Sequence, residues 1–278
     1  MKIAMKGIAA ALILLAWACP SPAAGDRELA LAIYKSFKAG QALPLASKEM
    51  AGLTLAHAYG VQAALLAIFR SHMDQVAGFK AGLTSKAVQQ RFGAKGPAFG
   101  VLMSSMRSYG EVDRKSYYRL MLEVEIGYLL GKPISSPVTH RTVRQYVVGI
   151  APAVELPDLA FADLKAITLP DIVAANVTCR GFILGKTVRT GQVDPNAVQG
   201  QLWRDGKALG PAVSGKAALG SQWEALAWTV NQALALYGPL GEGSVIITGS
   251  LGPMFPGEPG SYKAVFSGGL GQVAFEVK

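Results

Sequence analysis

The chain has 278 residues, of which 51% are hydrophobic and 16% are charged, and its formal net charge is +9. Its lysines and arginines are scattered without interleaved aromatic side chains, which argues against nucleic acid as a partner and favours small anionic molecules. With only 3 histidines and 2 cysteines, the chain lacks the parts for a histidine-rich metal centre, a serine–histidine triad or a disulfide framework.

Residues 1–24 have the form of a secretory signal peptide. Two lysines precede an apolar core over residues 8–18, and a break with small residues follows. We expect cleavage near Ala24 and an exported, periplasmic product. Lipoprotein processing at Cys19 is the alternative, which the bulky Trp17 disfavours. Beyond this segment we find no apolar run long enough to span a bilayer.

Residues 25–75 predict an N-terminal helical arm. Apolar positions recur at helical spacing over 28–39, and Gly40 is well placed to end that helix. A second helix is predicted to begin with Ser47 as its cap and to continue through Phe69. The remaining chain is long enough for one large domain carrying this arm.

Residues 76–278 form the predicted catalytic domain, which opens with a short apolar strand that Lys80 interrupts. A turn and a short helix with Ser85 near its cap follow. A lysine in such a run either extends to solvent or neutralises a bound anion, and the residues alone leave both interpretations open.

Two carboxylates interrupt the apolar run over residues 120–131. The run alternates like a strand, so Glu123 and Glu125 project from one face with their Cβ atoms about 6.5 Å apart. This spacing suits a shared hard cation, while a solvated acidic face on a half-exposed strand is the alternative. Glu155 closes another apolar run and could supply a third oxygen ligand.

A glycine-rich turn at residues 249–252 follows a strand of the buried type. Free backbone amides in such a turn suit an anion, although hairpins also use turns of this composition.

These segments, in this order, resemble the 2-keto-4-pentenoate hydratases of the fumarylacetoacetate hydrolase superfamily. The resemblance covers nearly all of the chain after the signal peptide. It is carried by residues 58–62, 78–90, 99–102, 123–126, 152–155, 174–176 and 248–254. It implies an α+β fold, in which a mixed β-roll or sandwich of the fumarylacetoacetate hydrolase C-terminal type follows the helical arm.

The resemblance also implies a site. Mg²⁺ or Mn²⁺ would be held by Glu123, Glu125 and Glu155, and would chelate a 2-oxo acid through its carboxylate and keto oxygens. Lys80 matches the family lysine that acts as a charge partner or proton donor, a role that desolvation would assist by lowering its pKa. The substrate-binding residues implied are Thr248, Gly249, Ser250, Leu251 and Asn176. A homo-oligomer is also expected, because such relatives commonly assemble.

Two departures from the family pattern affect the predicted reaction. The hydratases read Pro-Asp-Phe-Gly and Ala-Asp-Asn where this chain has Ala98 and Ala175, so two acids are missing. A metal-dependent hydratase or lyase acting on a 2-oxo acid or its dienol form is the first prediction. The alternatives are a carbon–carbon hydrolase, against which the missing histidines count, a 2-oxo acid decarboxylase, or an exported binding protein without catalysis.

Overall fold

The computed structural model describes residues 24–278. The predicted signal peptide therefore lies outside the described residues, apart from Ala24 at the start of the first helix. Among the described residues, we find no helix with the length and apolar character needed to cross a membrane.

A nine-stranded mixed sheet forms the body of the molecule. Its strand order is β2-β1-β12-β5-β6-β7-β3, with β13 paired to β5 and β8 paired to β6. The β1–β12 and β3–β7 pairs are parallel and the other pairs are antiparallel. The strands are β1 (Val76–Gly82), β2 (Ala98–Met103), β3 (Arg107–Ser108), β5 (Met121–Leu130), β6 (Val147–Pro157), β7 (Cys179–Leu184), β8 (Val188–Arg189), β12 (Val245–Ile247) and β13 (Phe255–Pro256).

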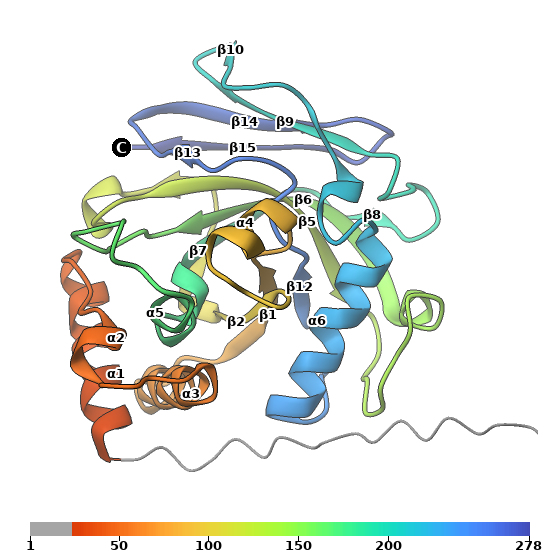
Figure 1. Ribbon diagram of the computed structural model, residues 1–278. Coiled ribbons are helices and arrows are strands. Elements are labelled where there is room, and N and C mark those ends of the chain that lie inside the picture. Colours follow the sequence, from red (N-terminus) through yellow and green to blue (C-terminus); the bar gives the residue numbers. More distant parts are fainter. Residues whose placement is uncertain (1–23) are drawn as a thin grey trace, which may run out of the picture.

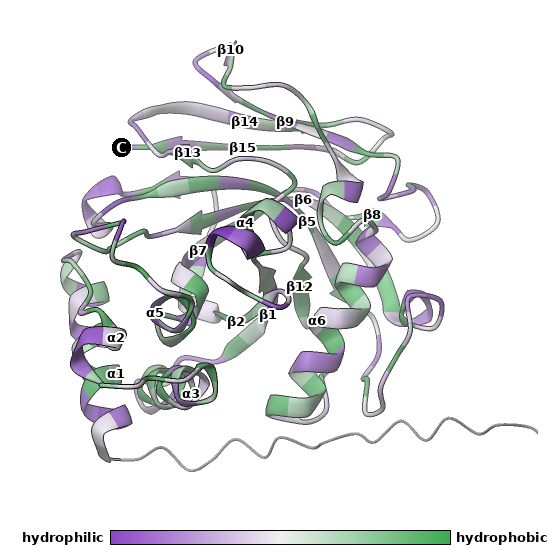
Figure 2. Cartoon of the chain, viewed as in Figure 1, coloured by the Kyte–Doolittle hydropathy of each residue, from purple (hydrophilic) through white to green (hydrophobic). Residues whose placement is uncertain are grey.

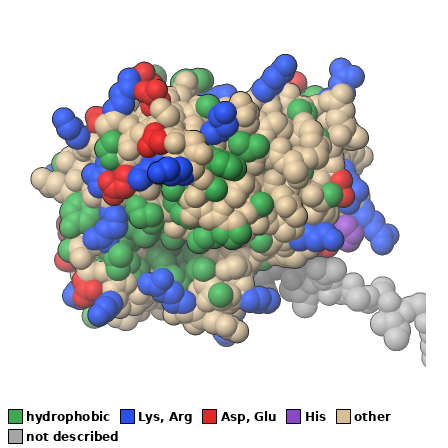
Figure 3. Space-filling view, turned by 90° about the horizontal axis from the view of Figure 1, so that it is seen from above, with side chains coloured by type: hydrophobic (Ala, Val, Ile, Leu, Met, Phe, Trp, Pro, Cys, Tyr) green, Lys and Arg blue, Asp and Glu red, His purple; other side chains and the backbone are tan. Residues whose placement is uncertain are grey.

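A six-stranded sheet covers β5 and β6 and makes a sandwich with the larger sheet (Figure 1). Side chains of β14 and β15 alternate between buried and exposed, as expected for strands with one face on a core and one in solvent. Lys and Arg side chains are spread over the outer side of the molecule above this sheet, interspersed with Asp and Glu (Figure 3). The strands are β4 (Glu111–Val112), β9 (Gln199–Arg204), β10 (Lys207–Ala208), β11 (Val213–Ser214), β14 (Gly260–Phe266) and β15 (Gly271–Val277).

Helices pack against β1, β2 and β12 of the larger sheet. The longest one on the C-terminal side, α6, packs on β1 and β12 and shows hydrophobic and hydrophilic residues in turn along its length (Figure 2). The α-helices are α1 (Ala24–Ala39), α2 (Ala46–Glu49), α3 (Leu55–Ser71), α4 (Lys86–Arg91), α5 (Leu169–Ala174) and α6 (Gln222–Tyr237). Short 3₁₀ turns are η1 (Ser104–Met106), η2 (Arg114–Ser116), η3 (Val143–Tyr146), η4 (Asn176–Thr178) and η5 (Gly215–Ala217). The predicted α+β architecture is thereby confirmed.

The N-terminal arm is helical, but the predicted start of its second helix is wrong. Gly40 follows α1 with a φ of +60°, as expected of a glycine that ends a helix. The long helix α3 is capped by Thr54, whose hydroxyl accepts a hydrogen bond from the His57 N–H at 3.2 Å. Ser47 lies in the separate single turn α2, where its N–H and hydroxyl both donate to Asp171.

Candidate metal centre

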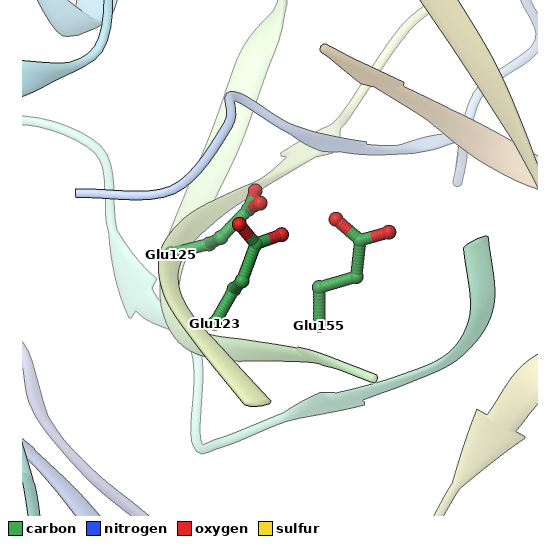
Figure 4. A group of neighbouring side chains, drawn as sticks. All are labelled: Glu123, Glu125 and Glu155. Carbon is green, nitrogen blue, oxygen red and sulfur yellow. The ribbon is translucent and has the colours of Figure 1, made fainter. Parts of the chain in front are cut away.

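Three glutamates converge on one point at the end of the β5–β6 pair. Glu123 lies directly opposite Glu155 in the antiparallel register, and Glu125 projects from the same face of β5. One carboxylate oxygen from each residue lies within 4.8 Å of the others (Figure 4). Glu125 and Glu155 are completely buried and Glu123 is half-buried, so the alternative of a solvated acidic strand face is wrong.

The electrostatics of this cluster favour an added positive charge. Burial first and the Glu155 carboxylate second raise the pKa of Glu123 to about 8, and burial raises the pKa of Glu125 well above its ordinary value. Within the described residues, Glu125 Oε1 and Glu155 Oε2 have no hydrogen-bond partner. Buried carboxylate oxygens without partners are costly, whereas all-oxygen sets of this kind bind hard divalent cations. The donor set therefore fits such a cation.

Lys80 lies at the same point, on β1, which β12 separates from β5 in the sheet. Its side chain is only 2% exposed, so the interpretation in which it extends to solvent is wrong. Its Nζ forms an ion pair with Glu155 and donates to the Val177 carbonyl oxygen at 3.2 Å. Burial acts to lower the pKa of Lys80, but the Glu155 carboxylate raises it above its usual range. The expected fall in this pKa is therefore not seen.

The stem of Lys80 lies against a glycine on the neighbouring strand. Gly100 pairs with Lys80 across β1 and β2. A Cβ atom at Gly100 would lie 2.9 Å from Lys80 Cγ and 3.2 Å from the Asn176 carbonyl oxygen. The glycine therefore leaves the space through which the lysine reaches the carboxylates.

A strained turn supplies the carbonyl that Lys80 contacts. Asn176, Val177 and Thr178 have φ values of 54°, 52° and 56°, in the left-handed region that β-branched residues rarely adopt. The Asn176 side chain accepts from the Val101 N–H and donates to the Val101 carbonyl, both at 2.8 Å. This pair of hydrogen bonds holds the turn against β2. Strained backbone of this kind persists only where surrounding contacts fix it, and it is common at functional sites.

The predicted substrate-binding residues separate into two groups. Ser250 and Leu251 line a cavity of about 410 Å³ that also exposes Lys80 and Glu123. Thr248 is buried and does not line that cavity. Its hydroxyl donates a hydrogen bond to Gln222 Oε1 at 2.6 Å. Asn176 is likewise buried, its side chain is hydrogen-bonded to the Val101 backbone, and it does not line that cavity.

The glycine-rich turn binds an anion that belongs to the protein itself. The Gly249 N–H donates to Glu125 Oε2 at 2.8 Å, and the Leu251 N–H donates to the Val124 carbonyl. The sequence predicted free amides in this turn for an anion. The N–H groups of Gly249 and Leu251 are instead engaged within the protein. Gly249 orients a candidate metal ligand instead, and its φ of +97° suits glycine.

Most of the cavity wall was not predicted from the sequence. The segment between β6 and α5, together with α5 itself, contributes a group of apolar side chains with irregular spacing and no motif. These residues are Leu159, Phe161, Leu164, Ile167 and Ile172. Ala98 and Ala175, where the hydratases carry acids, are both buried and do not line the cavity. Among the described residues, the charged side chains that line it are Lys80, Arg91 and Glu123.

The fold and site together define a class of α+β proteins, in which a mixed β-sandwich presents carboxylates and a lysine at one cavity. Residues 94–278 match the fumarylacetoacetate (FAA) hydrolase C-terminal family, and the chain belongs to this family. It is 30% identical over 254 residues to 2-keto-4-pentenoate hydratase from Paraburkholderia xenovorans, an alignment that covers 90% of this chain and 93% of the relative. The predicted family is therefore confirmed.

Solved structures agree with the fold. A 4-oxalocrotonate decarboxylase from Pseudomonas putida G7, complexed with magnesium and adipate, superposes with a TM-score of 0.85 at 23% identity over 91% of this chain and 97% of that chain. A fumarylpyruvate hydrolase from Pseudomonas aeruginosa, in complex with Mn²⁺ and pyruvate, gives a TM-score of 0.54 at 14% identity over 72% and 88% of the two chains. At these identities the comparison establishes the fold.

Proposed function

We propose that this chain is a divalent-metal-dependent enzyme of the hydratase type that acts on a 2-oxo acid or its dienol form. The observation that carries the proposal is the meeting of Glu123, Glu125 and Glu155 with Lys80 at one cavity. The hydratase relative, at 30% identity over 90% of the chain, supports the same reaction class. Mg²⁺ or Mn²⁺ is the proposed cation, because the ligand set is entirely oxygen.

Each residue of the site has a defined role in this proposal. The three glutamates would hold the cation, and the Gly249 N–H keeps the Glu125 carboxylate in its orientation. When bound, the cation would polarise the keto oxygen of the substrate and stabilise negative charge there. Lys80 holds a proton at Nζ within the cavity, where it can pair with the substrate carboxylate or donate that proton to the carbon chain.

A decarboxylase is the second candidate, and the two alanines favour it. Water addition needs a group that removes a proton from water and one that protonates carbon, and Ala98 and Ala175 provide neither. Loss of carbon dioxide from a conjugated 2-oxo acid needs only an electron sink and one proton donor. The remaining candidate is an exported binding protein, which would keep the cation and the substrate but show no turnover.

An absorbance assay with 2-hydroxypenta-2,4-dienoate separates these candidates. We expect decay of the dienol that depends on Mg²⁺ and is abolished by a chelator. The Lys80→Met variant should lose about 100-fold or more in turnover, because positioned proton donors contribute roughly that much. The exposed Lys86 lies outside the cavity lining, so Lys86→Met is the matched control and should retain activity.

Other outcomes are equally informative. Full activity in Lys80→Met would exclude the proposed role of that lysine. Carbon dioxide release from a 2-oxo acid with a conjugated second carboxylate would identify the decarboxylase. Metal-dependent substrate binding without absorbance change would identify the binding protein, and absence of metal binding would contradict all three.

We also propose that the protein is exported and that it forms a homo-oligomer. The lysines, apolar core and small residues of segment 1–24 support export. Mass spectrometry of the N-terminus in the periplasmic fraction tests cleavage near Ala24 against lipid attachment at Cys19. Light scattering on the purified protein tests the oligomeric state.

A further inference from the structure

We propose that Gln222 is a positioning residue of the candidate metal centre, because it fixes the turn that orients the Glu125 carboxylate. This inference rests on the proposed function, since it concerns how strongly the three glutamates would hold a cation. It adds a residue of α6, which contributes none of the glutamates. The observations that carry it are the hydrogen bonds of the Gln222 side chain and backbone.

The Gln222 side chain is completely buried, where an amide is costly unless it is hydrogen-bonded. Its Nε2 donates to the Gly215 carbonyl oxygen at 2.7 Å. A carbonyl oxygen can only accept, so this contact fixes the orientation of the amide and turns Oε1 toward two hydroxyl groups. The Tyr128 hydroxyl donates to Oε1 at 3.0 Å, and the Thr248 hydroxyl donates to it at 2.6 Å. The amide therefore holds β5 and the residue after β12 at the same time.

Thr248 connects this amide to the candidate metal centre. Its hydroxyl has one hydrogen to donate, and the Ile126 carbonyl oxygen, a second acceptor, lies farther away at 3.3 Å. The stiff β-branched side chain transmits the position of its hydroxyl to its own backbone. The next residue is Gly249, whose N–H donates to Glu125 Oε2 at 2.8 Å. Gln222 thus acts on Glu125 through Thr248 and Gly249.

The turn that carries Gly249 depends on side-chain contacts for its position. In the part of the chain that the structure describes, the sheet pairing of β12 ends at Ile247. The backbone is next tied to β5 at Leu251, whose N–H donates to the Val124 carbonyl oxygen at 2.9 Å. Thr248 and Gly249 lie between these two points, so the bond from Thr248 to the buried amide limits their movement.

Gln222 is itself held by contacts that do not involve this turn. Its backbone N–H donates to Asn196 Oδ1 at 2.8 Å, and its Nε2 reaches Gly215. A Cβ atom at Gly215 would lie 2.1 Å from the Pro195 carbonyl oxygen, so the loop that holds the amide is tightly packed. The amide is therefore a fixed point against which the turn is placed.

Two variants of similar shape test the inference, with Mg²⁺ affinity measured by calorimetric titration. Gln222→Met removes the amide, and Thr248→Val removes only the hydroxyl. Orienting partners of metal ligands are typically worth about 10- to 100-fold in affinity, so we expect each variant to bind Mg²⁺ about tenfold more weakly. Both changes remove the same contact, so the double variant should also be about tenfold weaker. Effects that multiply to about 100-fold would show that the two residues act separately and would overturn the inference.

Thr229→Val is the matched control. Thr229 is a completely buried residue of the same helix, and its hydroxyl donates to the Ala225 carbonyl oxygen at 2.7 Å. Its loss should lower the melting temperature and leave the Mg²⁺ affinity unchanged. An equal loss of Mg²⁺ affinity in Thr229→Val would show that lower stability alone weakens metal binding, and would overturn the inference.

Hydrogen exchange of the metal-free protein supplies a readout that does not require a cation. Residues 248–251 should exchange faster in Gln222→Met and Thr248→Val than in the unmodified protein, while residues 245–247 of β12 should change less. Unchanged exchange of residues 248–251 in both variants would overturn the inference. If the unmodified protein binds no Mg²⁺, the proposed function fails, and the exchange rates still decide whether Gln222 holds the turn.

Discussion

At the scale of single residues, the fold buries carboxylates that would be better solvated in water. Glu125 and Glu155 are buried side by side, and Lys80 is paired with the second of them. One lysine cannot neutralise three carboxylates. The pKa values of Glu123 and Glu125 are therefore raised, so that these groups hold protons more readily when no cation is bound. The site is therefore coupled to protons as well as to metal.

This coupling predicts an unusual pH dependence of stability. The folded-state pKa of Glu123 is about 8, far above the ordinary value of 4.5 from which it is shifted. Between these values the folded state binds more protons than the unfolded state, so stability should decrease as pH rises from about 5 to about 8. Thermal melts of chelator-treated protein across this range provide the measurement.

The same melts with Mg²⁺ provide the control. Because the cation requires deprotonated carboxylates, the increase in melting temperature caused by Mg²⁺ should grow as pH rises. A metal effect that is constant between pH 5 and pH 8 would show that these carboxylates do not titrate together with cation binding.

At the scale of elements, the site depends on close contact between β1, β2 and η4. The Lys80 stem passes over Gly100, while the strained turn η4 is fixed to β2 through Asn176 and Val101. Only part of this arrangement can be predicted from the sequence. The alternation of Glu123 and Glu125 follows from the two-residue period of a strand. No local signal predicts left-handed conformations at Val177 and Thr178, because tertiary contacts impose them.

The Gly100→Ala variant tests this contact. Its new methyl group would meet the Lys80 side chain and the Asn176 carbonyl, and should displace one of them at a cost of about 1–3 kcal/mol in unfolding free energy. We also expect a loss of turnover. Gly96→Ala is the matched control, since a Cβ atom there would have no heavy atom within 4 Å. Equal stability and turnover in the two variants would contradict the need for close approach at Gly100.

At the scale of the whole molecule, the N-terminal arm supports one wall of the cavity. The buried Asp171 in α5 accepts hydrogen bonds from the N–H and hydroxyl of Ser47 and from the N–H and hydroxyl of Thr168. Ile172, the next residue, lines the cavity. The sequence indicated Ser47 as a helix cap because serine is common at caps, but the partner that it has in the fold is 124 positions away.

The Asp171→Ala variant should separate the arm from α5. Loss of a buried carboxylate that accepts several hydrogen bonds is expected to lower the unfolding free energy by about 3 kcal/mol or more, measured by denaturant titration. Glu28→Ala on α1 removes an exposed carboxylate and should stay within about 0.5 kcal/mol of the unmodified protein. A similarly small change in Asp171→Ala would show that the arm is held by other contacts.

The position of β12 has a consequence for the order in which the protein assembles. β12 lies between β1 and β5, although more than 100 residues separate it from the end of β5, and it leads into Gly249 and Ser250. Contacts at such sequence separation form late and slow the search for the native state. A growing or truncated chain that lacks this segment has neither the amide that orients Glu125 nor the strand that joins β1 to β5 in the sheet. The cation is therefore acquired by a finished chain, and the compartment in which folding ends determines which metal is available to it.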